Sequence, residues 1–313
     1  MTNTDPHPEL SSSRDCPTID GRRQVQRVRA RITEVGGIPV ARSVPTRERR
    51  TIGAWCFLDH IGPTRLAADE PGMRIGPHPH TGLQTFTWMI AGEILHRDSL
   101  GSEQVVRPGE VNLMTAGQGI AHSEESIGDS DRLHAVQLWI ALPYADRETE
   151  PRFDHYPYLP RWREQGADFT LLTGHFREHN APTLAYSPLI GMDLTHPSGG
   201  PVTIPLRPDY EYGLLPLEGV FACEGENYDV NELAYFGTGR SEVVFEAPPG
   251  GRALLLGGEP LNDELLMWWN FVGYSRAEIA EAQRDWEAGS DRFGDIPQFD
   301  GPRLSPPPIP WKV

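Results

Sequence analysis

Glycine and proline divide this chain into short segments. The 313 residues include 32 Gly and 30 Pro, and between about residues 35 and 260 these recur between short apolar or alternating runs. Glycine supplies the positive φ of tight turns, while proline is excluded from helix interiors and from central strands. Short runs separated by turn residues are typical of antiparallel β structure. We therefore predict an all-β fold.

One segment near the C-terminus has the opposite pattern. Ser275 and Glu278 have the spacing of a capping box, and Ile279, Ala282 and Trp286 follow at helical intervals. The side chains of such a box satisfy backbone N–H groups at a helix start. We predict a short helix over residues 275–290.

Both ends of the chain are predicted to lie outside the domains. Residues 1–24 are polar and contain too little apolar surface to offset the entropy of ordering, so we expect a disordered arm. The last segment, 291–313, contains six prolines and is expected to lie extended on the surface. A polyproline ligand for a partner is the alternative for that segment.

Two pairs of similar segments indicate an internal repeat. QTFTWMIAG at 84–92 resembles EYGLLPLEG at 211–219, and AGQG at 116–119 resembles FGTG at 236–239. The pairs keep their order and fall in different halves of the chain. At about 150 residues per domain, the length also favours two domains. We predict two copies of one β-barrel.

The domain boundary is placed where prolines cluster between residues 143 and 165. The first domain is then 25–145 and the second 146–274. Within the first, Val28, Ala30 and Ile32 alternate with polar residues, as in a half-buried strand. The arginines around this strand could form an anion site, but their alternation favours a solvated strand face.

Charge and composition exclude several functions. The net charge of −16 opposes direct binding of nucleic acid. Lys312 is the only lysine, so Schiff-base chemistry, kinase chemistry and a P-loop are excluded. The three cysteines have no metal-binding spacing, and no apolar stretch is long enough for a signal peptide or a membrane span. We expect a cytoplasmic protein that does not enter a membrane.

Two histidine-containing pairs carry the candidate chemistry. His78 and His80 are two residues apart, and His122 and Glu124 have the same spacing. Residues i and i+2 of a strand project from one face, so two strands could direct four ligands to one centre. Three imidazoles and a carboxylate suit Fe(II), Mn(II), Ni(II), Cu(II) or Zn(II). Octahedral geometry would leave two positions open for substrate or dioxygen.

These residues also allow other assignments. A histidine in an apolar strand is more often a core residue, but the second pair after a glycine-rich turn favours metal binding. Glu125 could replace Glu124, although strand parity turns it away from His122. We give no ligand role to the histidines that could lie near the metal or on the surface: His60, His96 and His134.

Aromatic residues of the first domain could line a substrate pocket. Phe86 and Trp88 share the parity of His78 and His80, so they could stack on a flat substrate. Packing in the core is the alternative for both residues.

The second domain is predicted to lack the metal site. The repeat alignment places Pro205, Arg207, Glu242 and Val244 at the four ligand positions, and this set does not bind a transition metal. The second copy would then be structural, a lid or a docking surface.

Several segments between about residues 25 and 290 resemble the pirin family, which is a bicupin branch of the cupin superfamily. They are RRTIG at 49–53, PHPHTG at 77–82, MTAGQGIAHSEE at 114–125, LHAVQLWIALP at 133–143 and GGEPL at 257–261.

The resemblance implies two stacked jelly-roll barrels that face each other, with metal in the N-terminal one. It implies that His78, His80, His122 and Glu124 bind a non-haem iron. The general cupin pattern has a glutamate where this chain has Gln84, which is a departure from the standard ligand set.

The resemblance implies two classes of function. Bacterial pirin-like proteins are similar to quercetin 2,3-dioxygenases, which open a flavonol ring with dioxygen and release carbon monoxide. Glu124 would accept the proton of the flavonol 3-hydroxyl as general base. Eukaryotic pirins instead act as iron-dependent, redox-responsive regulators through protein partners. We favour the enzyme, acting as a monomer on a small phenolic substrate, with Fe(II) as the metal.

Overall fold

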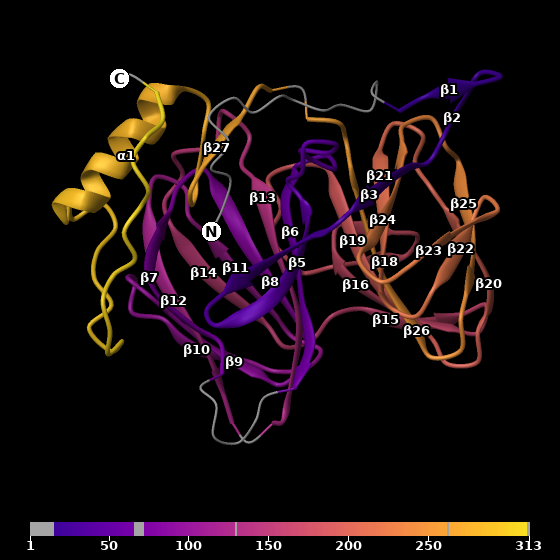
Figure 1. Cartoon of the computed structure of the whole chain (residues 1–313), viewed down its shortest axis with the longest axis horizontal. Coiled ribbons are helices and arrows are strands. Elements are labelled where there is room, and N and C mark those ends of the chain that lie inside the picture. The colour runs from indigo at the N-terminus through magenta and orange to yellow at the C-terminus, as the bar shows by residue number, and fades with distance from the viewer. Residues whose placement is uncertain (1–15, 66–71, 129, 262, 312–313) are drawn as a thin grey trace.

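The structure is a computed structural model, and it describes residues 16–65, 72–128, 130–261 and 263–311. Two β-barrels lie side by side, one built mainly from the first half of the chain and the other from the second (Figure 1). Each barrel consists of a seven-stranded and a four-stranded sheet, and the strands within these sheets pair antiparallel. The prediction of an all-β, two-barrel fold is confirmed.

The first barrel carries the candidate ligands. In spatial order its seven-stranded sheet contains β14 (Arg152–Tyr156), β11 (Val111–Thr115), β8 (Leu83–Ala91), β13 (Arg132–Ala141), β6 (Trp55–Arg65), β5 (Ile38–Val44) and β4 (Arg31–Val35). Its four-stranded sheet contains β7 (Arg74–His80), β12 (Ile120–Ile127), β9 (Glu93–Asp98) and β10 (Glu103–Val106).

The second barrel repeats this order strand for strand. Its seven-stranded sheet contains β3 (Gln26–Arg29), β24 (Glu232–Gly237), β21 (Glu211–Glu218), β26 (Gly251–Gly258), β19 (Leu189–His196), β16 (Ala167–Thr173) and β15 (Arg161–Glu164). Its four-stranded sheet contains β20 (Gly200–Pro205), β25 (Glu242–Ala247), β22 (Phe221–Cys223) and β23 (Glu226–Tyr228). The segments that suggested the repeat, in β8 and β21, occupy equivalent places.

The two barrels exchange one edge strand each. β3 precedes the first barrel in sequence but pairs with β24 of the second, and β14 follows the first barrel but pairs with its β11. The barrels therefore do not coincide with the predicted ranges 25–145 and 146–274. The alternating run that begins at Val28 is also two strands, because the chain passes from one sheet to the other between β3 and β4. This change of sheet leaves Ile32 exposed although Val28 is buried.

The two seven-stranded sheets share a hydrophobic core. Trp55, Phe86 and Trp88 of the first barrel pack in one cluster with Leu215 and Leu254 of the second. The indole of Trp55 also donates a hydrogen bond of 3.2 Å to the carbonyl of Gly257. The outer face of each seven-stranded sheet is therefore buried by the other barrel, and the inner face closes the barrel interior.

The predicted helix is present as α1 (Arg276–Ala288). Ser275 caps it by accepting a hydrogen bond from the N–H of Glu278, and Gly289 ends it with φ 68°. This positive φ is readily adopted by glycine. A short hairpin of β27 (Leu266–Trp268) and β28 (Phe271–Gly273) precedes the helix. Among the described residues, no helix combines the length and the apolar character that a membrane crossing needs.

The proline-rich tail is extended, but it is not a free surface segment. Phe293, Ile296 and Phe299 are buried in a cluster with Trp268 of the hairpin and Trp286 of α1. Figure 1 shows this segment, in yellow, running from α1 alongside β7 and β12. The apolar residues of the tail explain the difference from the prediction, since their burial ties the tail to the first barrel.

The N-terminal arm is ordered in the part that the structure describes. β1 (Thr18–Ile19) and β2 (Arg22–Arg23) form a hairpin, and Cys16 is buried beside Gly237. The predicted disorder of residues 1–24 is therefore wrong for 16–24, and residues 1–15 lie outside the described part. One more hairpin, of β17 (His175–Phe176) and β18 (His179–Asn180), lies in the second half of the chain.

A buried histidine pair joins the barrels away from the candidate ligands. The Nε2 atoms of His60 and His134 lie 2.8 Å apart, and Nδ1 of His60 lies 2.7 Å from the side-chain oxygen of Asn231 in the second barrel. Burial lowers the pKa of both histidines, and the neighbouring ring lowers that of His134 further. Both rings are therefore neutral in the folded protein at neutral pH.

The pair should make folding stability depend on acid. The pKa values of both histidines are lower in the folded protein than in the unfolded chain. Their contribution to the unfolding free energy is therefore fully present above about pH 6.5 and decreases as the pH falls. Between pH 6.5 and 5.0 the unfolding free energy of the wild type should decrease. In His134→Gln this decrease should be smaller by up to about 2 kcal/mol, since one histidine contributes at most about 1.4 kcal/mol per pH unit. Urea unfolding at both pH values measures this, with the exposed His175→Gln as control. An equal loss in the wild type and His134→Gln would contradict it.

Candidate metal centre

Three neighbouring strands of the four-stranded sheet carry the site. β7 supplies His78 and His80, and the adjacent β12 supplies His122 and Glu124, with His122 directly opposite His78. The register shifts between His122 and Glu124, where β7 has one residue more than β12, so the bulge lies in β7. All four side chains are buried, with exposed fractions between 1% and 6%. The i, i+2 spacing thus places both predicted pairs on the inner face of one sheet.

The three predicted histidine ligands converge. Their ring centroids lie 4.3 to 5.0 Å apart, and Nε2 of His80 is 3.1 Å from Nε2 of His122. One ring nitrogen from each of His78, His80 and His122 lies within 4.8 Å of the others. This spacing allows one metal ion to contact all three.

The outer nitrogens of two rings show which atom would bind a metal. Nδ1 of His78 is 2.9 Å from the carbonyl oxygen of Gly76, and Nδ1 of His80 is 2.9 Å from that of Asn270. A carbonyl oxygen only accepts, so each Nδ1 carries the proton and each Nε2 has a free lone pair. Such an outer hydrogen bond is the usual support of a metal-binding histidine.

Burial also favours the metal-binding form of the histidines. It lowers the pKa of His78 to about 3, and burial together with the neighbouring histidines lowers the pKa values of His80 and His122 well below 6.5. Neutral imidazole is the form that binds metal. The residues therefore fit a late first-row divalent metal, whose preferred ligands include imidazole nitrogen.

Glu124 lies beside the histidines and Glu125 does not. The Glu124 carboxylate is within 4.8 Å of nitrogens of His122 and His96, in a group that shares only His122 with the group of His78 and His80, and burial raises its pKa. Glu125 faces outward and forms ion pairs with Arg74 and Arg97, which lower its pKa. The structure thus agrees with the parity argument that favoured Glu124.

A pocket in the barrel interior reaches these four residues. Opposite the histidines, Arg42 and Asp59 form a buried two-bond ion pair, with distances of 2.7 and 2.6 Å. Phe57 and Trp139 are stacked with centroids 4.2 Å apart and line the same pocket. Leu304 of the C-terminal tail completes the lining. The pocket thus combines an aromatic wall, a charged pair and the histidines.

Phe86 and Trp88 lie elsewhere. Both are in the core between the two barrels and are absent from the pocket lining. The parity argument assumed one continuous strand, but the chain turns at Thr81 and Gly82 and continues as β8 in the other sheet. Gln84 points to the same side as Phe86 and bonds to the Thr115 hydroxyl and the Leu184 carbonyl.

Phe86→Ala separates the core role from the pocket role. Because the ring is fully buried between the barrels, the substitution should lower the unfolding free energy by about 3–5 kcal/mol, as is usual for a core phenylalanine. Metal affinity at a temperature where the variant is folded should not change. Denaturant unfolding and a metal titration measure the two quantities. A variant of normal stability with impaired substrate binding would restore the pocket role.

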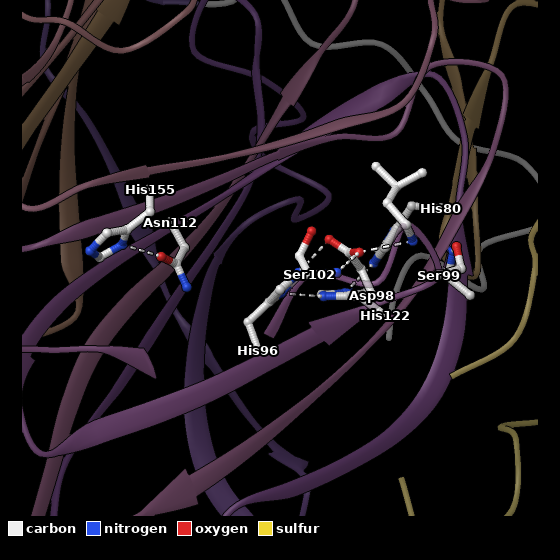
Figure 2. A network of polar contacts seen from close by, with 10 residues as sticks. His80, His96, Asp98, Ser99, Ser102, Asn112, His122 and His155 are labelled. Atoms are coloured by element: carbon white, nitrogen blue, oxygen red, sulfur yellow. Dashed lines mark hydrogen bonds and ion pairs between the residues drawn. The ribbon is translucent and has the colours of Figure 1, made fainter. Parts of the chain in front are cut away.

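Sequence reasoning missed the contribution of β9. His96 and Asp98 are buried at the same i, i+2 spacing, and in register Glu124 lies opposite His96 and His122 opposite Asp98. Figure 2 shows His96, Asp98 and His122 gathered in one group, with His80 close by. The sequence HRD at 96–98 is a third alternating pair that could have signalled this. His60 and His134, in contrast, lie at the contact between the barrels.

Fold and site together define a class. Two barrels with a histidine and carboxylate cluster inside the first are the architecture of a bicupin. The chain matches the family model described as Pirin over residues 37–140, and the one described as Pirin C-terminal cupin domain over residues 191–294. The chain belongs to the pirin family.

Individual relatives agree with this assignment. A Pseudomonas aeruginosa protein named "Putative quercetin 2,3-dioxygenase" is 58% identical and spans 100% of this chain and 99% of its own. The crystal structure of a quercetin 2,3-dioxygenase from Acinetobacter baumannii has a TM-score of 0.90 at 44% identity, covering 92% of this chain and 97% of that one. The bacterial pirin YhhW from Escherichia coli, crystallised with nickel(II), shares the fold with a TM-score of 0.61 at 17% identity, over 76% of this chain and 100% of that one.

Proposed function

We propose that this protein is a dioxygenase that uses one metal ion in the first barrel to open a flavonol or a related phenolic or enolic substrate with dioxygen. The observation that carries the proposal is the convergence of His78, His80 and His122 at a pocket with an aromatic wall. The similarity to proteins named as quercetin 2,3-dioxygenases supports the substrate class.

His78, His80, His122 and Glu124 would hold the metal, for which we propose Fe(II) on the basis of the family. Mn, Ni, Cu and Zn are compatible with the same ligand set. When bound, the metal would lower the pKa of a substrate hydroxyl and bring substrate and dioxygen together.

Glu124 is proposed to take the proton of the substrate hydroxyl. Burial raises the pKa of this carboxylate, which brings its basicity closer to neutral pH than that of an exposed glutamate. Its carboxylate lies within 4.8 Å of a ring nitrogen of His122, so it would be close to a substrate bound at the metal. The proton is then held inside the barrel and away from bulk water.

The pocket walls are proposed to select flat, aromatic substrates. The stacked pair of Phe57 and Trp139 offers the aromatic surface that Phe86 and Trp88 do not provide here. Leu304 of the C-terminal tail also lines the pocket. The Leu304 N–H donates to the Pro77 carbonyl and the Trp286 indole donates to the Leu304 carbonyl, so the tail is held in place there. Water would be excluded from this part of the barrel.

The test is quercetin loss in air by Fe(II)-loaded protein, followed by absorbance, with carbon monoxide measured as the second product. Metal-free protein and His78→Ala are the controls. We expect turnover only in the loaded wild type. If stoichiometric metal is bound and no turnover follows, the quercetinase proposal is wrong and a redox-responsive regulator acting through protein partners is favoured.

A further inference from the structure

We propose that Asp98 and His96 form a hydrogen-bonded relay that fixes His122 in the tautomer whose Nε2 can bind the metal. The proposal rests on the metal site described above. It makes Asp98 and His96 positioning residues, which act through His122 and do not touch the metal.

The relay begins at a carboxylate with fixed orientation. Oδ1 of Asp98 accepts hydrogen bonds from the backbone N–H groups of Leu100, at 2.9 Å, and Ser102, at 3.0 Å. Its other oxygen, Oδ2, lies 3.0 Å from Nε2 of His96. Asp98 is only 1% exposed, so water does not compete for these contacts. Figure 2 shows Asp98 close to both Ser102 and His96.

The positions of the protons follow from the donors and acceptors. An ionised carboxylate only accepts, so Nε2 of His96 carries a proton. With Nε2 as the donor, the other nitrogen of the His96 ring, Nδ1, acts as the acceptor, and it lies 3.3 Å from Nδ1 of His122. Nδ1 of His122 must therefore be the donor. This leaves the lone pair on Nε2 of His122, which faces His80.

All three histidines of the site are thereby given the same tautomer. Backbone carbonyl oxygens accept the Nδ1–H of His78 and of His80. For His122, Nδ1 of His96 is the acceptor in place of a carbonyl oxygen. The ring of His96 is itself held by stacking on Phe153, with centroids 4.4 Å apart and planes at 15°. A carboxylate behind a histidine also increases the basicity of the ligand that it supports.

The relay also discriminates between two possible ligand groups. His96, His122 and Glu124 lie close enough together to suggest a second metal position. However, in the relay one proton lies between the Nδ1 atoms of His96 and His122, which are 3.3 Å apart, so these two atoms cannot both offer lone pairs. The metal therefore belongs on the other side of His122, with His78 and His80.

Asp98→Asn should reverse the relay while keeping the turn. The N–H groups of Leu100 and Ser102 require an acceptor, so the amide oxygen takes the place of Oδ1 and the amide nitrogen faces His96. The nitrogen donates to Nε2 of His96, which makes Nδ1 of His96 a donor and Nδ1 of His122 an acceptor. Nε2 of His122 is then protonated, and metal affinity should fall about 10- to 100-fold, as for other lost supports of metal ligands.

His96 provides a matched pair of variants. His96→Gln can retain both functions, since its amide nitrogen can donate to Asp98 and its amide oxygen can accept from His122. His96→Leu removes both functions while leaving an apolar side chain of similar length against Phe153. A purely structural role predicts no difference between the two variants in metal affinity at equal stability. The relay predicts rescue by glutamine.

The experiment measures tautomer and affinity separately. Long-range ¹H–¹⁵N correlation of metal-free, ¹⁵N-histidine-labelled protein reports which nitrogen of His122 is protonated, and a competition titration with Ni(II) gives the affinity. We expect Nδ1–H in the wild type and His96→Gln, Nε2–H in Asp98→Asn, and weaker Ni(II) binding in Asp98→Asn and His96→Leu. Nε2–H in the wild type, or unchanged tautomer and affinity in Asp98→Asn, would overturn the relay.

This design keeps the relay distinct from the proposed activity. The tautomer is read without metal or substrate, so a protein that does not oxidise quercetin can still confirm or contradict it. If Asp98→Asn fails to fold, the comparison of His96→Gln with His96→Leu decides. Equal Ni(II) affinities in that pair would overturn the proposal.

Discussion

His78→Ala is expected to weaken metal binding by more than about 100-fold and to abolish turnover. Loss of the residue that hydrogen-bonds to the outer nitrogen of a ligand already lowers metal affinity about 10- to 100-fold. Removal of the ligand itself should therefore lower the affinity further. Nε2 of His78 has a free lone pair because Nδ1 donates to the Gly76 carbonyl. Competition titration with Ni(II) or Fe(II) measures the affinity.

A matched control distinguishes ligand loss from damage to the barrel. His155 belongs to β14, is partly buried and bonds to Asn112 at a distance from the other histidines, as Figure 2 shows. His155→Ala should retain wild-type metal affinity. If His78→Ala and His155→Ala bind metal equally well, His78 is not a ligand.

Glu124→Gln is expected to lower kcat by about 10²- to 10⁴-fold in protein that is fully loaded with metal, the usual contribution of a general base. The amide has nearly the shape of the carboxylate, but it cannot take the substrate proton. Three histidines remain to hold the metal, so bound metal should stay stoichiometric at saturating concentration. Steady-state kinetics with a metal assay on the same samples separates the two effects.

The neighbouring residue supplies the control for Glu124. Glu125 carries the same group on the outer side of β12, where Arg74 and Arg97 pair with it. Glu125→Gln should therefore leave kcat within about twofold of the wild-type value, because a surface ion pair contributes little. Similar losses of kcat in both variants would show that Glu124 has no special role as base.

Turn residues and repeats were sufficient to predict the two barrels, because glycine and proline act locally on the backbone. The exchange of β3 and β14 was not predictable in the same way. Which sheet an edge strand joins depends on contacts with residues far away in sequence, such as those between β3 and β24. The burial of the tail was missed for a related reason, since Phe293 and Phe299 find their partners on α1 and the hairpin before it.

The ligand pairs were predictable because a period of two survives in any regular strand. His78 and His80 keep that period to the end of β7, but the turn at Gly82 starts a new strand in another sheet. Parity could not be carried across this turn, which explains why Phe86 and Trp88 lie in the core. The partnership of His96 with His122 required the pairing of β9 with β12, which sequence spacing does not reveal.

The most direct test of the central claim is a crystal structure of the metal-loaded protein with anomalous scattering recorded at the absorption edge of the bound metal. Our account predicts one ion per chain, bonded to Nε2 of His78, His80 and His122 and to the Glu124 carboxylate. An ion between His96 and His122, an ion in the second barrel, or a loaded protein whose metal lies outside the first barrel would contradict it.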